Sequence, residues 1–238
     1  MKRKALLIGN SNGLPGVKKD IANWFSFLTS DIGGAWYPSE IEIKMNPGKN
    51  ELMDLIKRMK GFYDFIIVVY SGHGAYSKGT ILEINEHEEY IYESDLKGIA
   101  SRQISVFDCC RGLLSDERSI NESIRIFNQR KIANFVRDYY DRRIMQSVEQ
   151  QISLYACSIG ESAYDSSDGG YYTKNLLRFA KDIGGERYLT TSIIHQEAAL
   201  KTTSEVFEKE KAIQKPDATL PRCVSCQQLI LSINPIIR

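Results

Sequence analysis

The sequence lacks the features that cross-link a small secreted protein or place a chain in a membrane. Its five cysteines are few and odd in number for 238 residues, which argues against a disulfide framework and suits a reducing compartment. An apolar run follows the basic N-terminal residues, but it ends at Gly9 and is too short for the core of a signal peptide. No other run approaches the length of a membrane span. We therefore expect a cytoplasmic protein without a membrane partner.

An excess of charge of either sign is also missing. The chain has 31 Lys and Arg residues against 30 Asp and Glu, and this net charge of +1 gives no reason to expect a nucleic-acid partner. Cys223 and Cys226 have the spacing of half a zinc site, but no second Cys or His pair follows, so we expect no metal site. Hydrophobic residues make up 42% of the chain, which is ordinary for a globular protein that needs neither disulfides nor a metal.

What is present is an alternation of short apolar runs with amphipathic stretches. Six runs predict strands, and the stretches between them predict helices on both faces of one sheet. This pattern favours an α/β fold with a roughly six-stranded, mostly parallel sheet. The predicted strands are 4–8, 41–45, 65–70, 104–107, 152–156 and 228–233; the predicted helices are 17–29, 50–60, 173–183 and 204–213, with a hairpin at 79–92, a short helix from about 94 and a helical stretch at 119–150.

Two of the predicted strands end in residues that can carry chemistry. The strand at 65–70 is followed by Ser71-Gly72-His73-Gly74, and the strand at 104–107 by Asp108-Cys109-Cys110-Arg111-Gly112. Parallel strands bring their carboxyl ends to the same edge of a sheet, where active sites of such folds lie. An imidazole that lies near a thiol can take its proton and produce a nucleophilic thiolate. The glycines let backbone N–H groups approach a substrate, and Gly74 and Cys110 would supply the two donors of an oxyanion hole.

The residues by themselves leave a structural alternative open. A cysteine in a strand-end loop is more often packed than reactive, and a histidine beside glycines can simply satisfy a turn. The two residues follow separate apolar runs in glycine-rich surroundings, and this joint placement makes a Cys–His site about as probable as its absence.

These motifs resemble the caspase-like cysteine protease clan, in particular its bacterial caspase-like, metacaspase and orthocaspase group. The caspase signature Gln-Ala-Cys-(Arg/Gln/Gly)-Gly places Cys110, not Cys109, at the catalytic position. From His73 to Cys110 the separation is 37 residues, shorter than the roughly 50 typical of caspases. The resemblance extends over most of the chain, through Gly9-Asn10, Ser153-Leu-Tyr-Ala-Cys157, Glu161-Ser-Ala-Tyr164, Gly169-Gly-Tyr-Tyr-Thr173 and the segment from Lys215 to Ile233.

The resemblance implies a single caspase-like peptidase domain over residues 1–238. Residues 1–111 would match the large subunit, 112–150 a helical linker or insert, and 151–238 the small subunit. The implied activity is a cysteine endopeptidase in which His73 and Cys110 form the catalytic dyad. In metacaspases an aspartate two residues before the nucleophile binds a basic P1 side chain, which precedes the cleaved bond, and Asp108 holds that position. Asp20 matches a second pocket aspartate, although an exposed helix charge is an equal alternative.

Two carboxylates would favour a guanidinium, so cleavage after Arg, with Lys second, is expected. Basic residues in 112–150 allow self-processing, whereas the helical spacing of apolar residues there favours an ordered segment. The chemistry requires no cofactor, but Ca²⁺, for which the acidic run 83–93 is a weak candidate, or a small nucleotide would be a possible activator.

The implied partners are protein or peptide substrates and an activating partner or second messenger, and the oligomeric state stays open. The implied role is a regulated effector of bacterial cell death or antiviral defence. The alternative is a catalytically silent caspase-like binding or sensor module.

Overall fold

The computed structural model describes residues 1–113, 134–166 and 168–236, and its centre is a six-stranded sheet. The sheet order is β12-β8-β7-β3-β1-β2, in which only β12 runs antiparallel to its neighbour. This arrangement confirms the expected α/β fold with a mostly parallel sheet. The strands are β1 Arg3–Gly9, β2 Ile41–Met45, β3 Phe65–Ser71, β7 Arg102–Asp108, β8 Gln150–Tyr155 and β12 Asp217–Thr219.

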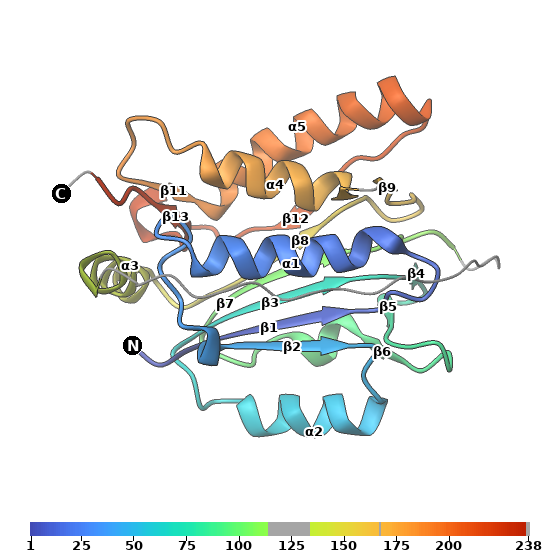
Figure 1. Ribbon diagram of the computed structural model, residues 1–238, viewed down its shortest axis with the longest axis horizontal. Helices are drawn as coiled ribbons and strands as arrows, with labels where there is room; N and C mark the ends of the chain where they lie inside the picture. The colour runs from blue at the N-terminus through green and yellow to red at the C-terminus, as the bar shows by residue number, and fades with distance from the viewer. Residues whose placement is uncertain (114–133, 167, 237–238) are drawn as a thin grey trace.

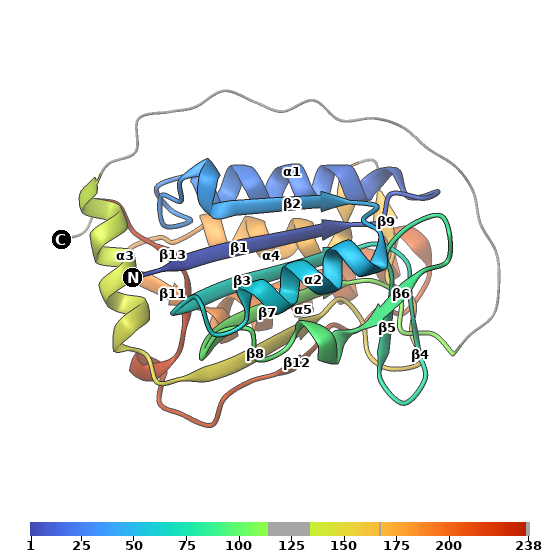
Figure 2. The ribbon, with the colours of Figure 1, turned by 90° about the horizontal axis from the view of Figure 1, so that it is seen from below.

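Helices cover both faces of this sheet, as the sequence predicts (Figure 1). One face carries α1 (Pro15–Thr29), α4 (Tyr171–Lys181) and α5 (Thr191–Glu210), and the other carries α2 (Lys49–Met59), which crosses the strands in Figure 2. Each face has its own apolar core. All seven residues of β3 are buried because the strand is covered on both sides, which explains its unbroken apolar sequence.

Three small sheets surround the central one. The predicted hairpin is present as β5 (Thr80–Glu83) and β6 (Tyr90–Tyr92), and β4 (Gly74–Tyr76) adds a third strand directly after His73. Two further pairs are antiparallel: β9 (Asp165–Ser166) with β10 (Gly169–Gly170), and β11 (Tyr188–Thr190) with β13 (Ile230–Ile233). Short 3-10 turns lie at η1 Pro38–Glu40, η2 Glu93–Leu96 and η3 Ser225–Gln227.

The prediction that 228–233 supplies the sixth strand of the central sheet is wrong. That segment forms β13, which pairs with β11, and the sixth strand is β12. Burial explains the error: β13 is completely buried beneath helices and therefore reads as an apolar strand. By contrast, β12 is a short edge strand with exposed Asp217 and Thr219, so it lacks the apolar signal of a sheet strand.

The predicted start of the helix at 204 is also wrong, because α5 begins at Thr191. The Thr190 side chain caps it by accepting a hydrogen bond from the Ile193 amide at 3.4 Å. Several residues on the buried face of its first half are polar, including Ser192 and His195, so the apolar periodicity that normally reveals a helix is weak there.

Within the predicted linker, α3 (Asn134–Gln146) confirms helical structure, while residues 114–133 lie outside the described part of the chain. This helix lies near the N-terminus of the chain, at the amino ends of the strands (Figure 2). Two arginine–carboxylate pairs attach it: Arg3 to Asp141 at 2.8 Å, and Arg137 to Glu40 at 2.7 Å. The helix is therefore anchored far from the strand ends that bear His73 and Cys110.

Candidate active site

His73 follows β3 in a loop that hydrogen bonds hold in place. The buried Tyr70 hydroxyl lies between two backbone carbonyl oxygens, that of His73 at 2.5 Å and that of Glu83, which share its single proton. The imidazole Nε2 lies 2.5 Å from the carbonyl oxygen of Asn12. A carbonyl can only accept, so Nε2 carries the proton and Nδ1 is left as the basic nitrogen.

Two adjacent cysteines follow β7, and the fold separates their environments. Cys109 is buried beneath the β4 backbone: a methyl group added at Gly74 would lie 2.7 Å from its sulfur. Burial raises the pKa of Cys109 well above its usual value. Cys110 is only partly buried and its sulfur faces the pocket, so it is the more accessible thiol of the two.

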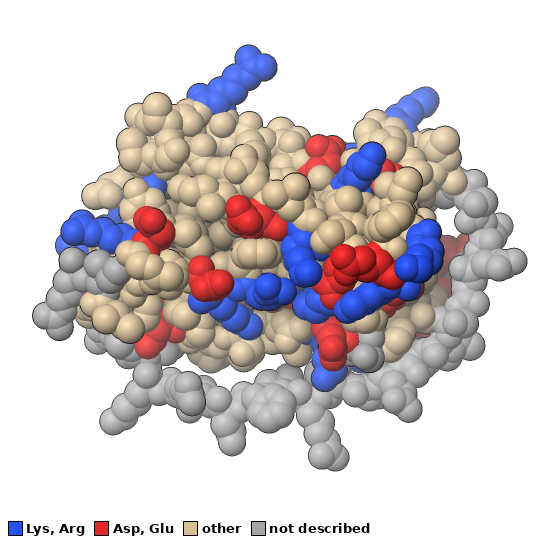
Figure 3. Space-filling view, turned by 90° about the horizontal axis from the view of Figure 1, so that it is seen from above, with Lys and Arg blue, Asp and Glu red and all other residues tan. Residues whose placement is uncertain are grey.

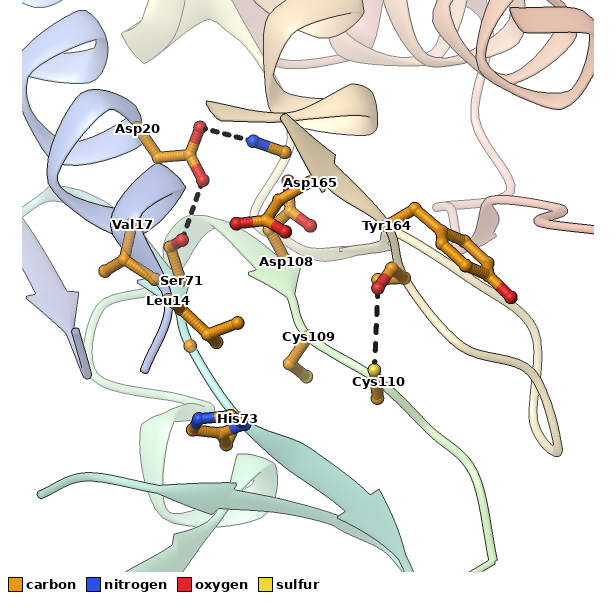
Figure 4. A pocket seen from close by; sticks show the side chains of 13 residues that line it. Leu14, Val17, Asp20, Ser71, His73, Asp108, Cys109, Cys110, Tyr164 and Asp165 are labelled. Carbon is orange, nitrogen blue, oxygen red and sulfur yellow. Dashed lines mark hydrogen bonds between the residues drawn. The ribbon is translucent and has the colours of Figure 1, made fainter. Parts of the chain in front are cut away.

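The Cys110 thiol donates to the carbonyl oxygen of Ala163 at 3.6 Å (Figure 4). Burial raises the pKa of this thiol too, which disfavours the thiolate in the present arrangement. His73 and Cys110 line the same pocket, yet among the described residues neither hydrogen-bonds to the other, because each bonds to a different backbone carbonyl. Proton exchange between them therefore requires a change of side-chain orientation.

The backbone segments predicted to form an oxyanion hole adjoin each other. A methyl group at Gly74 would lie 2.8 Å from the Cys110 carbonyl oxygen, so the two chain segments are in close contact. Arg111 fixes the loop from the other side. It is buried, hydrogen-bonds to Thr80 at 3.2 Å and to the Cys157 carbonyl at 3.3 Å, and packs on the Tyr155 ring.

Asp20 and Asp108 lie together in the same pocket. Asp20 is only 2% exposed and accepts hydrogen bonds from Ser71 Oγ at 2.8 Å and from the Gly170 amide at 3.0 Å. It is therefore not an exposed helix charge, which removes that alternative. Asp108 accepts a hydrogen bond from the Thr173 amide at 3.0 Å. Burial raises the pKa of Asp108 to about 6 and that of Asp20 well above its usual value, the latter also because Asp108 is near.

The glycine pair of β10 closes over these two carboxylates. A methyl group at Gly169 would lie 2.3 Å from Asp20 Oδ1, and one at Gly170 would lie 2.5 Å from Asp108 Oδ2. No larger residue fits at either position without displacing an aspartate. The pair thus gives a physical reason for the Gly169-Gly170 motif in the sequence.

The pocket has a volume of about 60 Å³, room for a few water molecules. Its lining includes residues that the sequence did not single out, namely Leu14, Val17, Ser71, Ala163 and Asp165. Ser71 could have been suspected because it opens the Ser-Gly-His-Gly motif. Nothing in the sequence assigned Asp165, which reaches the pocket only through the β9–β10 turn. Within the described ranges no group of three or more His, Cys, Asp or Glu side chains is arranged to hold a metal ion.

Outside the pocket, the features that bear on function are the hydropathy of the helices and the distribution of charge on the surface. None of the helices in residues 1–113, 134–166 and 168–236 has the length and apolar character of a membrane span. On the face formed by α1, α4 and α5, acidic and basic side chains are intermixed (Figure 3).

A parallel α/β sheet with a cysteine and a histidine at neighbouring strand ends, facing one pocket, defines the class of caspase-fold proteins. The family model for the caspase domain matches residues 2–224, so the chain belongs to the caspase-domain family of cysteine peptidases. Among solved structures, caspase-1 from Spodoptera frugiperda is similar with a TM-score of 0.60 at 13% identity, over 92% of this chain and 86% of that one. The search of curated proteins gave no match.

Proposed function

We propose that the protein is a cysteine endopeptidase that cleaves peptide bonds after Arg, and less efficiently after Lys. The observation that carries this proposal is one pocket lined by a thiol, an imidazole and two buried carboxylates, those of Cys110, His73, Asp20 and Asp108. A basic P1 side chain would neutralise carboxylates that are otherwise costly to bury. Family membership supports cysteine peptidase chemistry in general.

The proposed reaction uses His73 first as a base and then as an acid. Nδ1 accepts the proton of Cys110, whose sulfur attacks the carbonyl carbon of the scissile bond and forms a tetrahedral oxyanion. The N–H groups of Gly74 and Cys110 stabilise this oxyanion, and His73 returns the proton to the departing amine. Water then hydrolyses the thioester. The Asn12 carbonyl that accepts the Nε2 proton orients the ring and stabilises the imidazolium.

The arrangement of the two side chains supports a resting state that must be activated. The raised pKa of the Cys110 thiol and its hydrogen bond to the Ala163 carbonyl both disfavour the thiolate as the chain stands. Activation by a partner protein, a small nucleotide or Ca²⁺, or self-cleavage within 112–150, would suit a regulated effector of bacterial cell death or antiviral defence. In this proposal residues 1–111 and 151–238 form the two subunit-like parts of one domain.

A second candidate is a catalytically silent caspase-like module that binds or senses a partner. The separate hydrogen bonds of His73 and Cys110 favour this alternative, because an inert pair needs no mutual contact. The two candidates differ in whether the thiol reacts.

Labelling with a peptide electrophile that has Arg at P1 distinguishes them. Stoichiometric modification of Cys110, lost in Cys110→Ala and slowed at least about 100-fold in His73→Ala, supports the enzyme. Cys109→Ala is the matched control and should label normally. A protein that stays unlabelled, with or without Ca²⁺, nucleotides and cell extract, would be the silent module.

A further inference from the structure

A third carboxylate, that of Asp165, stands at the same pocket as Asp20 and Asp108. It comes from β9, in the part of the chain that follows the predicted linker, whereas Asp20 is on α1 and Asp108 ends β7. Asp20 and Asp108 are buried, while Asp165 is exposed. Three elements distant in sequence thus bring acids together (Figure 4), and Asp165 is the only exposed one of the three.

Electrostatic effects connect Asp165 with the rest of the site. Its negative charge raises the pKa of both Asp20 and Asp108, after the larger effect of their burial. Partial burial of its carboxyl group raises the pKa of Asp165, and the Gly16 amide and the nearby His73 imidazole oppose this rise without cancelling it. Asp165 therefore lies within electrostatic range of both the acid pocket and the base.

The buried pair offers limited acceptor capacity. Both oxygens of Asp20 already accept hydrogen bonds, from Ser71 and Gly170, and Asp108 accepts one from Thr173. A guanidinium has five N–H donors and needs several acceptors around its plane. An exposed carboxylate beside this pair would supply the missing ones.

We propose that Asp165 is a specificity-determining residue that contacts the basic P1 side chain at the mouth of the pocket. The proposal rests on the proposed function, because it assigns a role within the same substrate site. It also predicts that recognition of P1 needs both halves of the domain, since β9 belongs to the part after the linker.

A structural role for Asp165 must be separated from this one. Asp165 Oδ2 lies against the start of α1, where a methyl group at Gly16 would come within 2.6 Å of it, and the Gly16 amide donates a hydrogen bond to the Asp165 carboxylate. Leu14, at the N-cap of α1, offers no side-chain cap. Asn keeps an acceptor oxygen at this place and removes the charge, so Asp165→Asn tests the charge while retaining the helix contact.

Binding to a protein that cannot turn over its ligand gives the direct test. In a Cys110→Ala background, the affinity for a peptide amide ending in Arg is compared with that for the same peptide ending in uncharged citrulline, by calorimetry. Asp165→Asn should weaken Arg binding about ten- to hundredfold, the loss of one charge-assisted contact, and leave citrulline binding within about twofold. Asp168→Asn, an exposed carboxylate in the same turn, is the matched control and should change neither.

Unchanged Arg affinity in Asp165→Asn would overturn the proposal, as would a parent protein that does not prefer Arg to citrulline. If Arg binding depends on Asp165 while the wild-type chain neither cleaves nor is labelled, the peptidase assignment fails and the recognition role of Asp165 stands. The two ideas therefore fail separately.

Discussion

At the scale of single residues, the environment of each acid and thiol decides its chemistry more than its identity does. Cys109 and Cys110 are neighbours in the chain, yet one is buried against Gly74 and the other faces the pocket. Asp108 and Asp165 differ likewise in exposure. The caspase signature in the sequence distinguished Cys110 from Cys109, and the burial of Cys109 gives a physical reason for that choice.

The pKa of Asp108 predicts the pH dependence of substrate use. Because burial raises this pKa to about 6, Asp108 is protonated in the ligand-free protein below that pH and then attracts a cation poorly. The kcat/KM for a peptide with Arg at P1 should rise with pH through about 6. Asp108→Asn should abolish Arg-peptide cleavage, whereas Cys110 should remain reactive toward iodoacetamide. A wild-type profile without a step near that pH would contradict the assignment.

The raised pKa of Asp108 also predicts how stability depends on pH: the free energy of unfolding should fall over the same pH range in which substrate use rises. The folded state holds the Asp108 proton more tightly than the unfolded state, so stability is lost as pH rises from the usual aspartate pKa of 3.8 through about 6. Asp108→Asn removes this cost and can still accept the Thr173 amide. Its free energy of unfolding at pH 8 should exceed that of the wild type by on the order of 2 kcal/mol, and by much less at pH 4. Urea unfolding at both pH values measures the difference, and equal gains at both would be inconsistent with a titration effect.

At the scale of elements, the β9–β10 turn completes the site from the C-terminal half of the chain. It contributes Asp165, and its two glycines close over Asp20 and Asp108. The sequence motif around Gly169 was recognised through the family resemblance, but its physical task, a close approach of backbone to carboxylates, was not. That task is invisible in the sequence because the contacting residues are about 60 to 150 positions away.

A methyl group on this turn should therefore disrupt the pocket. Gly170→Ala would place its Cβ 2.5 Å from Asp108 Oδ2 and force the turn or the aspartate to move. We expect a loss of about 1–3 kcal/mol in unfolding free energy together with impaired labelling by an Arg electrophile. Gly185→Ala is the matched control, because nothing lies within 4 Å of its added methyl group. Thermal unfolding of both variants is the measurement, and an unaltered Gly170→Ala protein would show that the pocket tolerates displacement.

At the scale of the whole molecule, the central sheet joins the chain before residue 113 to the chain after residue 134. Strands β7 and β8 pair in parallel from Arg102–Gln150 to Phe107–Tyr155, and β12 extends the sheet beyond them. At the amino ends of the strands, α3 forms ion pairs with β1 through Arg3 and with η1 through Arg137. The chain before residue 113 and the chain after residue 134 therefore contact each other both within the sheet and at the amino ends of its strands.

A chain cut between residues 113 and 134 should consequently remain one particle. A recognition site for a sequence-specific protease, inserted there, provides the cut. We expect both fragments to elute together at the size of the intact chain. The cut leaves the apolar core that the two fragments share intact, and the free energy of burying that core holds them together. Size-exclusion chromatography measures the size of the cut protein, and a denaturing gel of the same sample verifies that the chain was cut. Separate elution of the two fragments would refute this prediction.

The sequence alone was sufficient for the class of fold, the five parallel strands and the presence of His73 and Cys110 at strand ends. These features are local: a strand buried on both faces must be apolar along its length, and a loop after it must break the run. Only the tertiary structure decided that β12 rather than β13 completes the sheet, that α5 begins at Thr191 and that Asp165 joins the acid pocket. Each of these three features depends on which parts of the chain, distant in sequence, pack against the segment. A short exposed strand, a helix with a polar buried face and a single aspartate show no hydrophobic periodicity, so the sequence does not reveal their packing partners.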